Sequence, residues 1–200
     1  MTLNELENSW NYYLSIEKDL NETSRYIEPT GQETTFSFEF YKIIMLSCAE
    51  VESTFKKICQ MIDSNKTYGN MADYKGTILG KYPHICDTVI CVPRWDAKNI
   101  YPFEGWDKGK LQWWDAYQDI KHSRFGMFNK ANYMNAVYSL GALYVLILYL
   151  YKINGHDCYA DRSLYFTSDY YSIPLYVKQA SELPDFKLEN NTDSHMEETI

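Results

Sequence analysis

The stretch from Trp113 to Phe125, WWDAYQDIKHSRF, gathers side chains that could move a proton or hold a phosphate. Histidine titrates near neutral pH, and a neighbouring carboxylate can orient its ring for acid–base chemistry. Asp115, Asp119 and His122 follow one another at helical spacing, and on a helix they fall within about 60° of one another. The pattern therefore predicts an acid–imidazole stripe opposite an apolar face, with His122 as the candidate catalytic group.

Carboxylates of a second predicted helix are potential partners of this imidazole. Glu50 and Glu52 stand in CAEVES, a comparable polar interruption of a helix with core character. Buried polar groups need hydrogen-bond partners, so we expect His122 on the inner or semi-buried face of its helix, within reach of a carboxylate. The candidates are Glu50, Glu52 and Asp119. Two structural alternatives stay open: solvated or capping carboxylates, and a histidine favoured by the dipole at a helix C-terminus.

Chemistry on a phosphate also needs a positive charge beside the imidazole. Lys121 and Arg124 are the nearest cations in the sequence. In a continuous helix Arg124 would point away from His122, whereas a break at residues 123–126 would free it to swing back.

Helical spacing of apolar residues predicts the elements that must position these groups. The sequence begins the first helix with a capping-box pattern, Thr2 and Glu5. The second helix could begin in extended form, because Phe36, Phe38 and Phe40 alternate. The expected main helices are residues 3–23, 36–63, 108–124 and 130–152.

The remaining segments are predicted from their breaker residues. Glycines and prolines punctuate residues 64–106, which predicts a long irregular excursion with a short helix at residues 72–81. A small C-terminal hairpin is expected around residues 167–171. The fold class is therefore all-α, a four-helix bundle in one domain of residues 1–180, and the acidic tail of residues 181–200 is expected to be disordered.

The fourth helix is expected to be the most buried element. It has no charged residue between Lys130 and Lys152, which a soluble helix sustains only when it is surrounded. Its length approaches that of a membrane span, but Asn135, Ser139 and five tyrosines in the segment 133–151 favour a bundle helix, so no membrane association is expected. If one side of this tyrosine-rich helix stayed exposed, it would form a homodimer surface.

Charge and cysteine usage restrict the compartment and the partners. The formal net charge of −8 excludes a general attraction to phosphates, so non-specific DNA binding is not expected. Five cysteines without a paired framework suit a reducing cytosol. The N-terminal sequence lacks the features of a signal peptide, and a cytoplasmic location is predicted.

No metal or cofactor is expected. A zinc site was considered because soft ligands recur, but their spacing is not that of a finger or ribbon. Those residues are His84, Cys86, Cys91, His156 and Cys158. The segment GTILG lacks the lysine of a phosphate-binding loop, and no GxSxG motif of a serine nucleophile occurs.

The motif YQDIKHSRF, followed by ALYVLILYLY and preceded by SCAEVESTFKKIC, resembles the HEPN superfamily (higher eukaryotes and prokaryotes nucleotide-binding), particularly uncharacterised bacterial members. The resemblance covers roughly residues 33–152. It implies a helical bundle, frequent dimerisation and, in many members, metal-independent RNA cleavage in toxin or antiphage systems.

The chain departs from the pattern of active members at one position. Those members resemble one another in an arginine that is separated from the histidine by four to six residues, and here Asp115, Ala116 and Tyr117 occupy the possible positions of that arginine. His122 therefore carries over as the motif histidine, while the arginine does not. The resemblance then implies a partner- or RNA-binding module of a toxin or antiphage system, or alternatively a metal-independent endoribonuclease. The site residues under the enzymatic interpretation are His122, Arg124, Lys121, Asp119, Glu50 and Glu52.

Because no recognised ligand pair occurs, we predict that chelation leaves the thermal midpoint of unfolding unchanged. The measurement is a thermal melt with and without EDTA. A large loss of stability that zinc restores would contradict the prediction.

Overall fold

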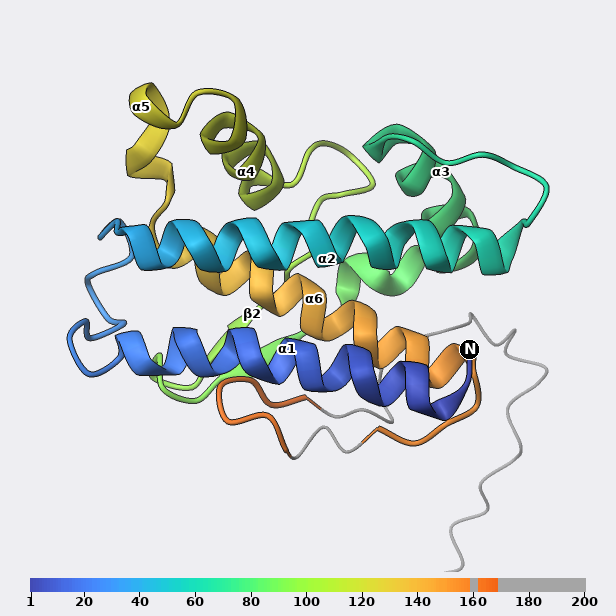
Figure 1. The fold of residues 1–200 in the computed structure, drawn as a ribbon, viewed down its shortest axis with the longest axis horizontal. Coiled ribbons are helices and arrows are strands. Elements are labelled where there is room, and N and C mark those ends of the chain that lie inside the picture. The colour runs from blue at the N-terminus through green and yellow to red at the C-terminus, as the bar shows by residue number, and fades with distance from the viewer. Residues whose placement is uncertain (159–161, 169–200) are drawn as a thin grey trace, which may run out of the picture.

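The computed structural model describes residues 1–158 and 162–168, and this part of the chain is mainly helical (Figure 1). The long helices are α1 (Leu3–Thr23), α2 (Phe38–Ile62) and α6 (Tyr133–Ile153). The shorter helices are α3 (Met71–Lys81), α4 (Gln112–His122) and α5 (Arg124–Met127). The acidic tail and most of the expected C-terminal hairpin lie outside the described residues.

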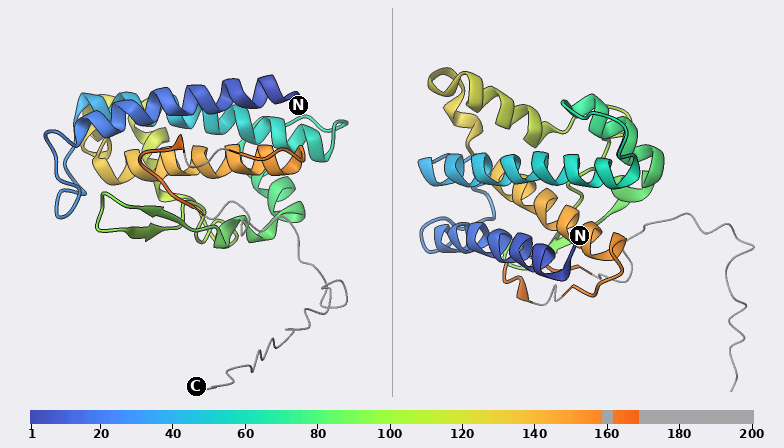
Figure 2. Two further views of the ribbon diagram at one scale, coloured as in Figure 1. Left: turned by 90° about the horizontal axis from the view of Figure 1, so that it is seen from below. Right: turned by 45° about the vertical axis from the view of Figure 1, so that its right-hand side comes forward.

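Helix α6 is the core of the molecule. It packs on α1, α2 and α4, and 17 of its 21 residues are buried, against 10 of 25 in α2. The views in Figure 2 show α6 between the two long helices and a small sheet. The prediction of the most buried element is confirmed. Of the described helices only α6 has the length and composition of a membrane span, and here protein elements surround it.

This burial overturns the expected dimer surface. A homodimer contact on the fourth helix requires an exposed side, and the buried residues of α6 lie all around the helix. Homodimerisation itself stays a prediction, but α6 has no exposed side that could form its interface.

The starts of the first two long helices follow their local sequence. In α1 the Glu5 N–H donates to Thr2 Oγ1 at 3.3 Å, and the Thr2 N–H donates to Glu5 Oε2 at 2.7 Å, which confirms the capping box. Before α2, Phe36 forms an antiparallel bridge with Asn132, and Ser37 then caps the helix. The extended alternative therefore holds for Phe36 only.

The long excursion contains a small sheet that the sequence analysis did not predict. Besides α3, which confirms the expected short helix, it forms a 3-10 turn at Pro83–Asp87 and an antiparallel pair, β1 (Ile90–Val92) and β2 (Lys98–Ile100). A Cβ atom on Gly141 of α6 would lie 2.8 Å from Ile90 Cδ1. Glycine at this position lets the sheet approach α6 closely. With this small sheet as an addition, the described part of the chain is mainly helical, as the sequence predicts.

The helix that carries the central motif is shorter than predicted. Consecutive turns occupy the residues before it, with Gly105 at a φ of +69°, so α4 starts at Gln112 rather than near residue 108. The helix ends at His122, and Ser123, with φ −139°, separates it from α5. A second 3-10 turn, Phe128–Lys130, then leads to α6, which starts three residues later than expected.

Residues 162–168 form a short segment that we call the C-terminal strap. Hydrogen bonds to one buried carboxylate hold it against α1. Glu17, only 3% exposed, accepts hydrogen bonds from the hydroxyls of Tyr13 and Ser163 and from two backbone N–H groups of the strap. The Tyr13 hydroxyl lies 2.6 Å from Glu17 Oε1, and burial, followed by the Glu17 charge, raises the pKa of Tyr13 well above its usual value. Farther along the strap, Thr167 exchanges backbone hydrogen bonds with Cys91 of β1.

We predict that Glu17→Ala lowers the free energy of unfolding by about 3 kcal/mol, because buried donors lose their acceptor. Glu17→Gln keeps one accepting oxygen and should lose less. Glu7→Ala, an exposed change of the same charge on the same helix, should stay within about 0.5 kcal/mol of wild type. Urea unfolding measures all three. Equal stabilities of Glu17→Ala and Glu7→Ala would contradict the role of the carboxylate.

Candidate functional site

His122 does not lie where the sequence analysis placed it. It is the last residue of α4 and is exposed to solvent. Within the described part of the chain, no hydrogen bond or ion pair joins it to Glu50, Glu52 or Asp119. The expectation of a semi-buried imidazole held by a carboxylate is therefore wrong, because the polar stripe of α4 faces outward while its apolar face covers α2 and α6.

The nearest carboxylate in the sequence is already engaged. Asp119 forms an ion pair with Lys130, which follows α5 and lies beside the end of α4. Both side chains are partly exposed, so the contribution of this pair to stability is modest. Its structural effect is to tie the turn after α5 to the last turns of α4.

The two glutamates of α2 do not form a common site. They are about 200° apart around the helix, so they cannot face the same neighbour. Burial raises the pKa of Glu50, whereas the negative charge of Glu52 affects the pKa of Cys48. Burial raises the pKa of Cys48, the Glu52 charge raises it further, and the Lys121 charge lowers it. Of the predicted set, Glu52 and Lys121 are thus near the same buried cysteine, where α4 crosses α2.

Helix α4 ends at His122, before the expected end at residue 124, so the alternative of a break holds, but it turns Arg124 toward aromatic rings. The Arg124 guanidinium carbon lies 5.9 Å from the ring centroid of Tyr41 and 4.9 Å from that of Phe125. Lys121 lies on the same stretch, with its ammonium nitrogen 5.2 Å from the ring centroid of Tyr117. These are cation–π contacts, which hold a cation near a surface without neutralising it.

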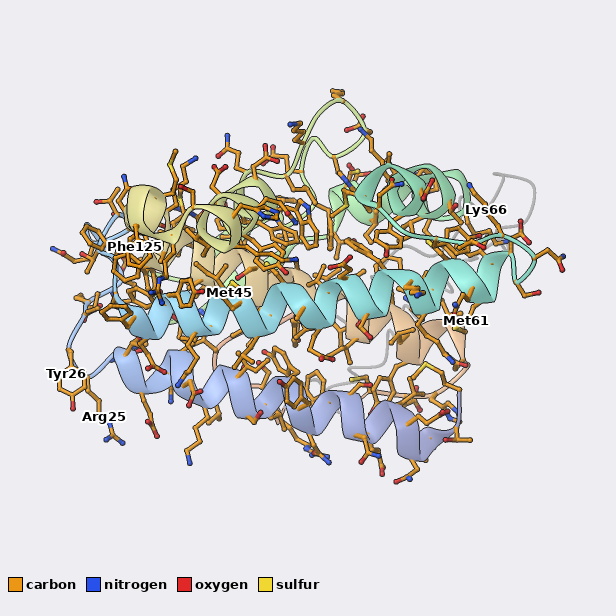
Figure 3. The ribbon with its side chains drawn as sticks, turned by 45° about the horizontal axis from the view of Figure 1, so that its top comes forward. Arg25, Tyr26, Met45, Met61, Lys66 and Phe125 are labelled. Atoms are coloured by element: carbon orange, nitrogen blue, oxygen red, sulfur yellow. The ribbon has the colours of Figure 1, made fainter. Side chains whose placement is uncertain are left out.

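An exposed aromatic cluster includes the rings that Arg124 contacts, at the end of the molecule where α2 begins. Phe128 contacts Phe36, Phe38 and Tyr41 with ring centroids 4.7–6.3 Å apart, and Arg124 links Tyr41 to Phe125. The exposed fractions are 94% for Phe125, 72% for Phe38 and 52% for Phe36. Figure 3 labels Phe125 at this end of the molecule and Met45 farther along α2. We call these residues the aromatic corner: Phe36, Phe38, Tyr41, Phe125, Met127 and Phe128.

The aromatic corner offers exposed rings and cations that could contact a ligand, but its side chains are not arranged for concerted acid–base catalysis. Lys121, His122 and Arg124 are exposed next to unpaired aromatic surface, which suits stacking on flat groups and contact with anions. Among the described residues, no carboxylate forms a hydrogen bond or ion pair with the His122 imidazole. The described residues also contain no group of three or more histidine, cysteine or acidic side chains that could hold a metal ion.

The sequence analysis missed the aromatic residues of the corner. The signals were available: Phe36 and Phe38 alternate before α2, and Phe125 stands in the break where helical spacing stops. For an apolar residue outside any periodic pattern, the sequence does not predict whether the side chain is buried or exposed. Its exposure became evident only when the neighbouring elements were in place.

Comparison of the chain with family models, with curated proteins and with solved structures found no match.

Proposed function

We propose that this protein is a binding module that takes single-stranded RNA on the aromatic corner. The observation that carries the proposal is the placement of Arg124 against Tyr41 and Phe125 in a cluster with three exposed phenylalanines, with the exposed Lys121 three residues earlier in the chain. Bases stack on exposed aromatic rings with little sequence preference, and neighbouring cations contact the backbone phosphates.

The distribution of charge supports a local site. The chain as a whole carries −8, so attraction to a polyanion must come from a restricted surface. Lys42 and Lys130 pair with carboxylates, whereas Lys121 and Arg124 make cation–π contacts only. Because only these two cations are proposed to contact phosphates, we expect RNA binding to be weak and sensitive to salt.

The resemblance to the HEPN superfamily supports the same assignment. The motif YQDIKHSRF ends at the corner, and α1, α2, α4 and α6 would correspond to the four-helix bundle of that superfamily. A module of this kind would serve a bacterial toxin or antiphage system in the cytoplasm. An aromatic surface with arginine and methionine also suits a protein partner, which is the outcome favoured if RNA does not bind.

Binding is tested by fluorescence anisotropy with a labelled single-stranded RNA oligonucleotide. With two phosphate contacts, the logarithm of the association constant should fall with the logarithm of salt concentration with a slope of about −1.4. Lys121→Ala combined with Arg124→Ala should abolish most of this slope. Phe125→Ala should weaken binding about tenfold through lost stacking.

Matched controls lie on α1 and the loop after it. Lys18→Ala combined with Arg25→Ala removes the same charge from exposed positions, and Tyr26→Ala removes an aromatic ring that is 86% exposed. These variants should bind as wild type does. Equal weakening by test and control variants, or no binding at low salt, would contradict the proposal.

A metal-independent endoribonuclease is the narrower alternative, favoured by the exposure of His122 between two cations. In that case His122 would transfer the proton, and Lys121 or Arg124 would stabilise charge on the phosphate. Purified wild-type protein in EDTA should then cleave RNA, and His122→Ala should abolish cleavage while RNA binding and the thermal midpoint stay unchanged. Intact RNA after prolonged incubation with the wild type would exclude the enzyme and leave the binding module.

A further inference from the structure

A cavity of about 320 Å³ lies at the opposite end of α4 from the aromatic corner. The loop of residues 101–111, the first turn of α4 and the first turns of α6 form its walls. The Trp113 indole N–H donates to the carbonyl of Pro102 at 2.8 Å, which fixes the loop against the helix. This volume matches the lower range of small-molecule sites.

The apolar part of the lining is largely aromatic. Tyr101, Trp113 and Tyr138 contribute rings, and Met134 contributes a thioether. Aromatic side chains bind other flat rings through stacked and edge-to-face contacts. The cavity therefore favours an aromatic ring over an aliphatic chain of similar volume.

One end of the lining is suited to an anion. Helix α4 follows Leu111, which supplies no side-chain cap, so the N–H groups of the first turn lack the usual side-chain acceptor. Lys110 and Gln112 line the cavity beside this turn. A lysine next to uncapped N–H groups favours a carboxylate there.

A buried amide lies in another part of the lining. Asn135 is only 8% exposed, and its side-chain nitrogen donates to the carbonyl of Lys130 at 2.9 Å. Its Oδ1 atom accepts no hydrogen bond from the described residues. Because Asn135 lines the cavity, a ligand O–H or N–H group can donate to this oxygen.

We propose that this cavity binds a small monoanionic aromatic carboxylic acid that carries a ring hydroxyl or ring N–H. The carboxylate lies at Lys110 and the start of α4, the ring lies among the aromatic side chains, and the ring donor reaches Asn135. Glu104, which also lines the cavity, disfavours a second negative charge on the ligand. This site is independent of the aromatic corner.

Isothermal titration calorimetry of the full chain tests the proposal with 4-hydroxyphenylacetate and indole-3-acetate. At least one acid should bind with a Kd of about 1 mM or tighter. Phenylacetate lacks the ring donor and should bind about tenfold more weakly than 4-hydroxyphenylacetate. The neutral 4-hydroxyphenylethanol and the non-aromatic cyclohexylacetate should also bind at least about tenfold more weakly.

The matched variants are Lys110→Ala, which removes a lining cation, and Lys108→Ala, which removes an exposed cation of the same loop that does not line the cavity. Lys110→Ala should weaken binding about tenfold, whereas Lys108→Ala should leave it unchanged. Failure of both acids to bind at about 10 mM, equal binding of the neutral analogue, or equal effects of the two lysine variants would overturn the proposal.

Discussion

The structure depends on the burial of α6. From Tyr133 to Tyr151 this helix carries no charged side chain, so every face of it must be covered by protein. Helices α1, α2 and α4, the small sheet and the C-terminal strap each cover part of it. The long excursion between α2 and α4 is thus part of the core packing, since Ile90 of β1 approaches the backbone of α6 at Gly141.

Tyrosines determine how the covering segments attach to α6. Burial raises the pKa of Tyr133, Tyr144 and Tyr149 to about 12, so each phenol remains a neutral hydrogen-bonding group in the core. Tyr133 and Tyr144 bond to side chains of the strap, and Tyr149 bonds to Thr88 of the excursion. Phenylalanine would cover a similar apolar area but could not form these directional contacts. The hydroxyls therefore help to specify where each segment lies, and the buried Glu17 has the same effect for the strap.

The surface at the end of α4 follows from the same packing. The apolar face of α4 covers α2 and α6, which turns Asp115, Asp119 and His122 outward. The helix then stops at Ser123, and the chain must return to the start of α6 through α5 and a 3-10 turn. This return places Phe125 in solvent and Phe128 against the residues that precede and begin α2. A surface with exposed rings and cations results, rather than an enclosed acid–base site.

The sequence by itself determined the elements that local interactions specify. The capping box of α1, the spacing of α2, the short helix α3 and the burial of α6 all follow from groups within a few residues of one another. Sequence reasoning did not find the pairing of β1 with β2, because such short strands lack a periodic pattern of sufficient length. It also misplaced the candidate site. A helical wheel gives the angle around one helix between Glu50 and Glu52, or between Asp119 and His122. Which side of each helix faces solvent and which faces protein depends on how the neighbouring helices pack. Tertiary packing alone decided that Asp119 pairs with Lys130, that Arg124 lies over aromatic rings and that His122 faces water, because these contacts depend on how separate helices pack together.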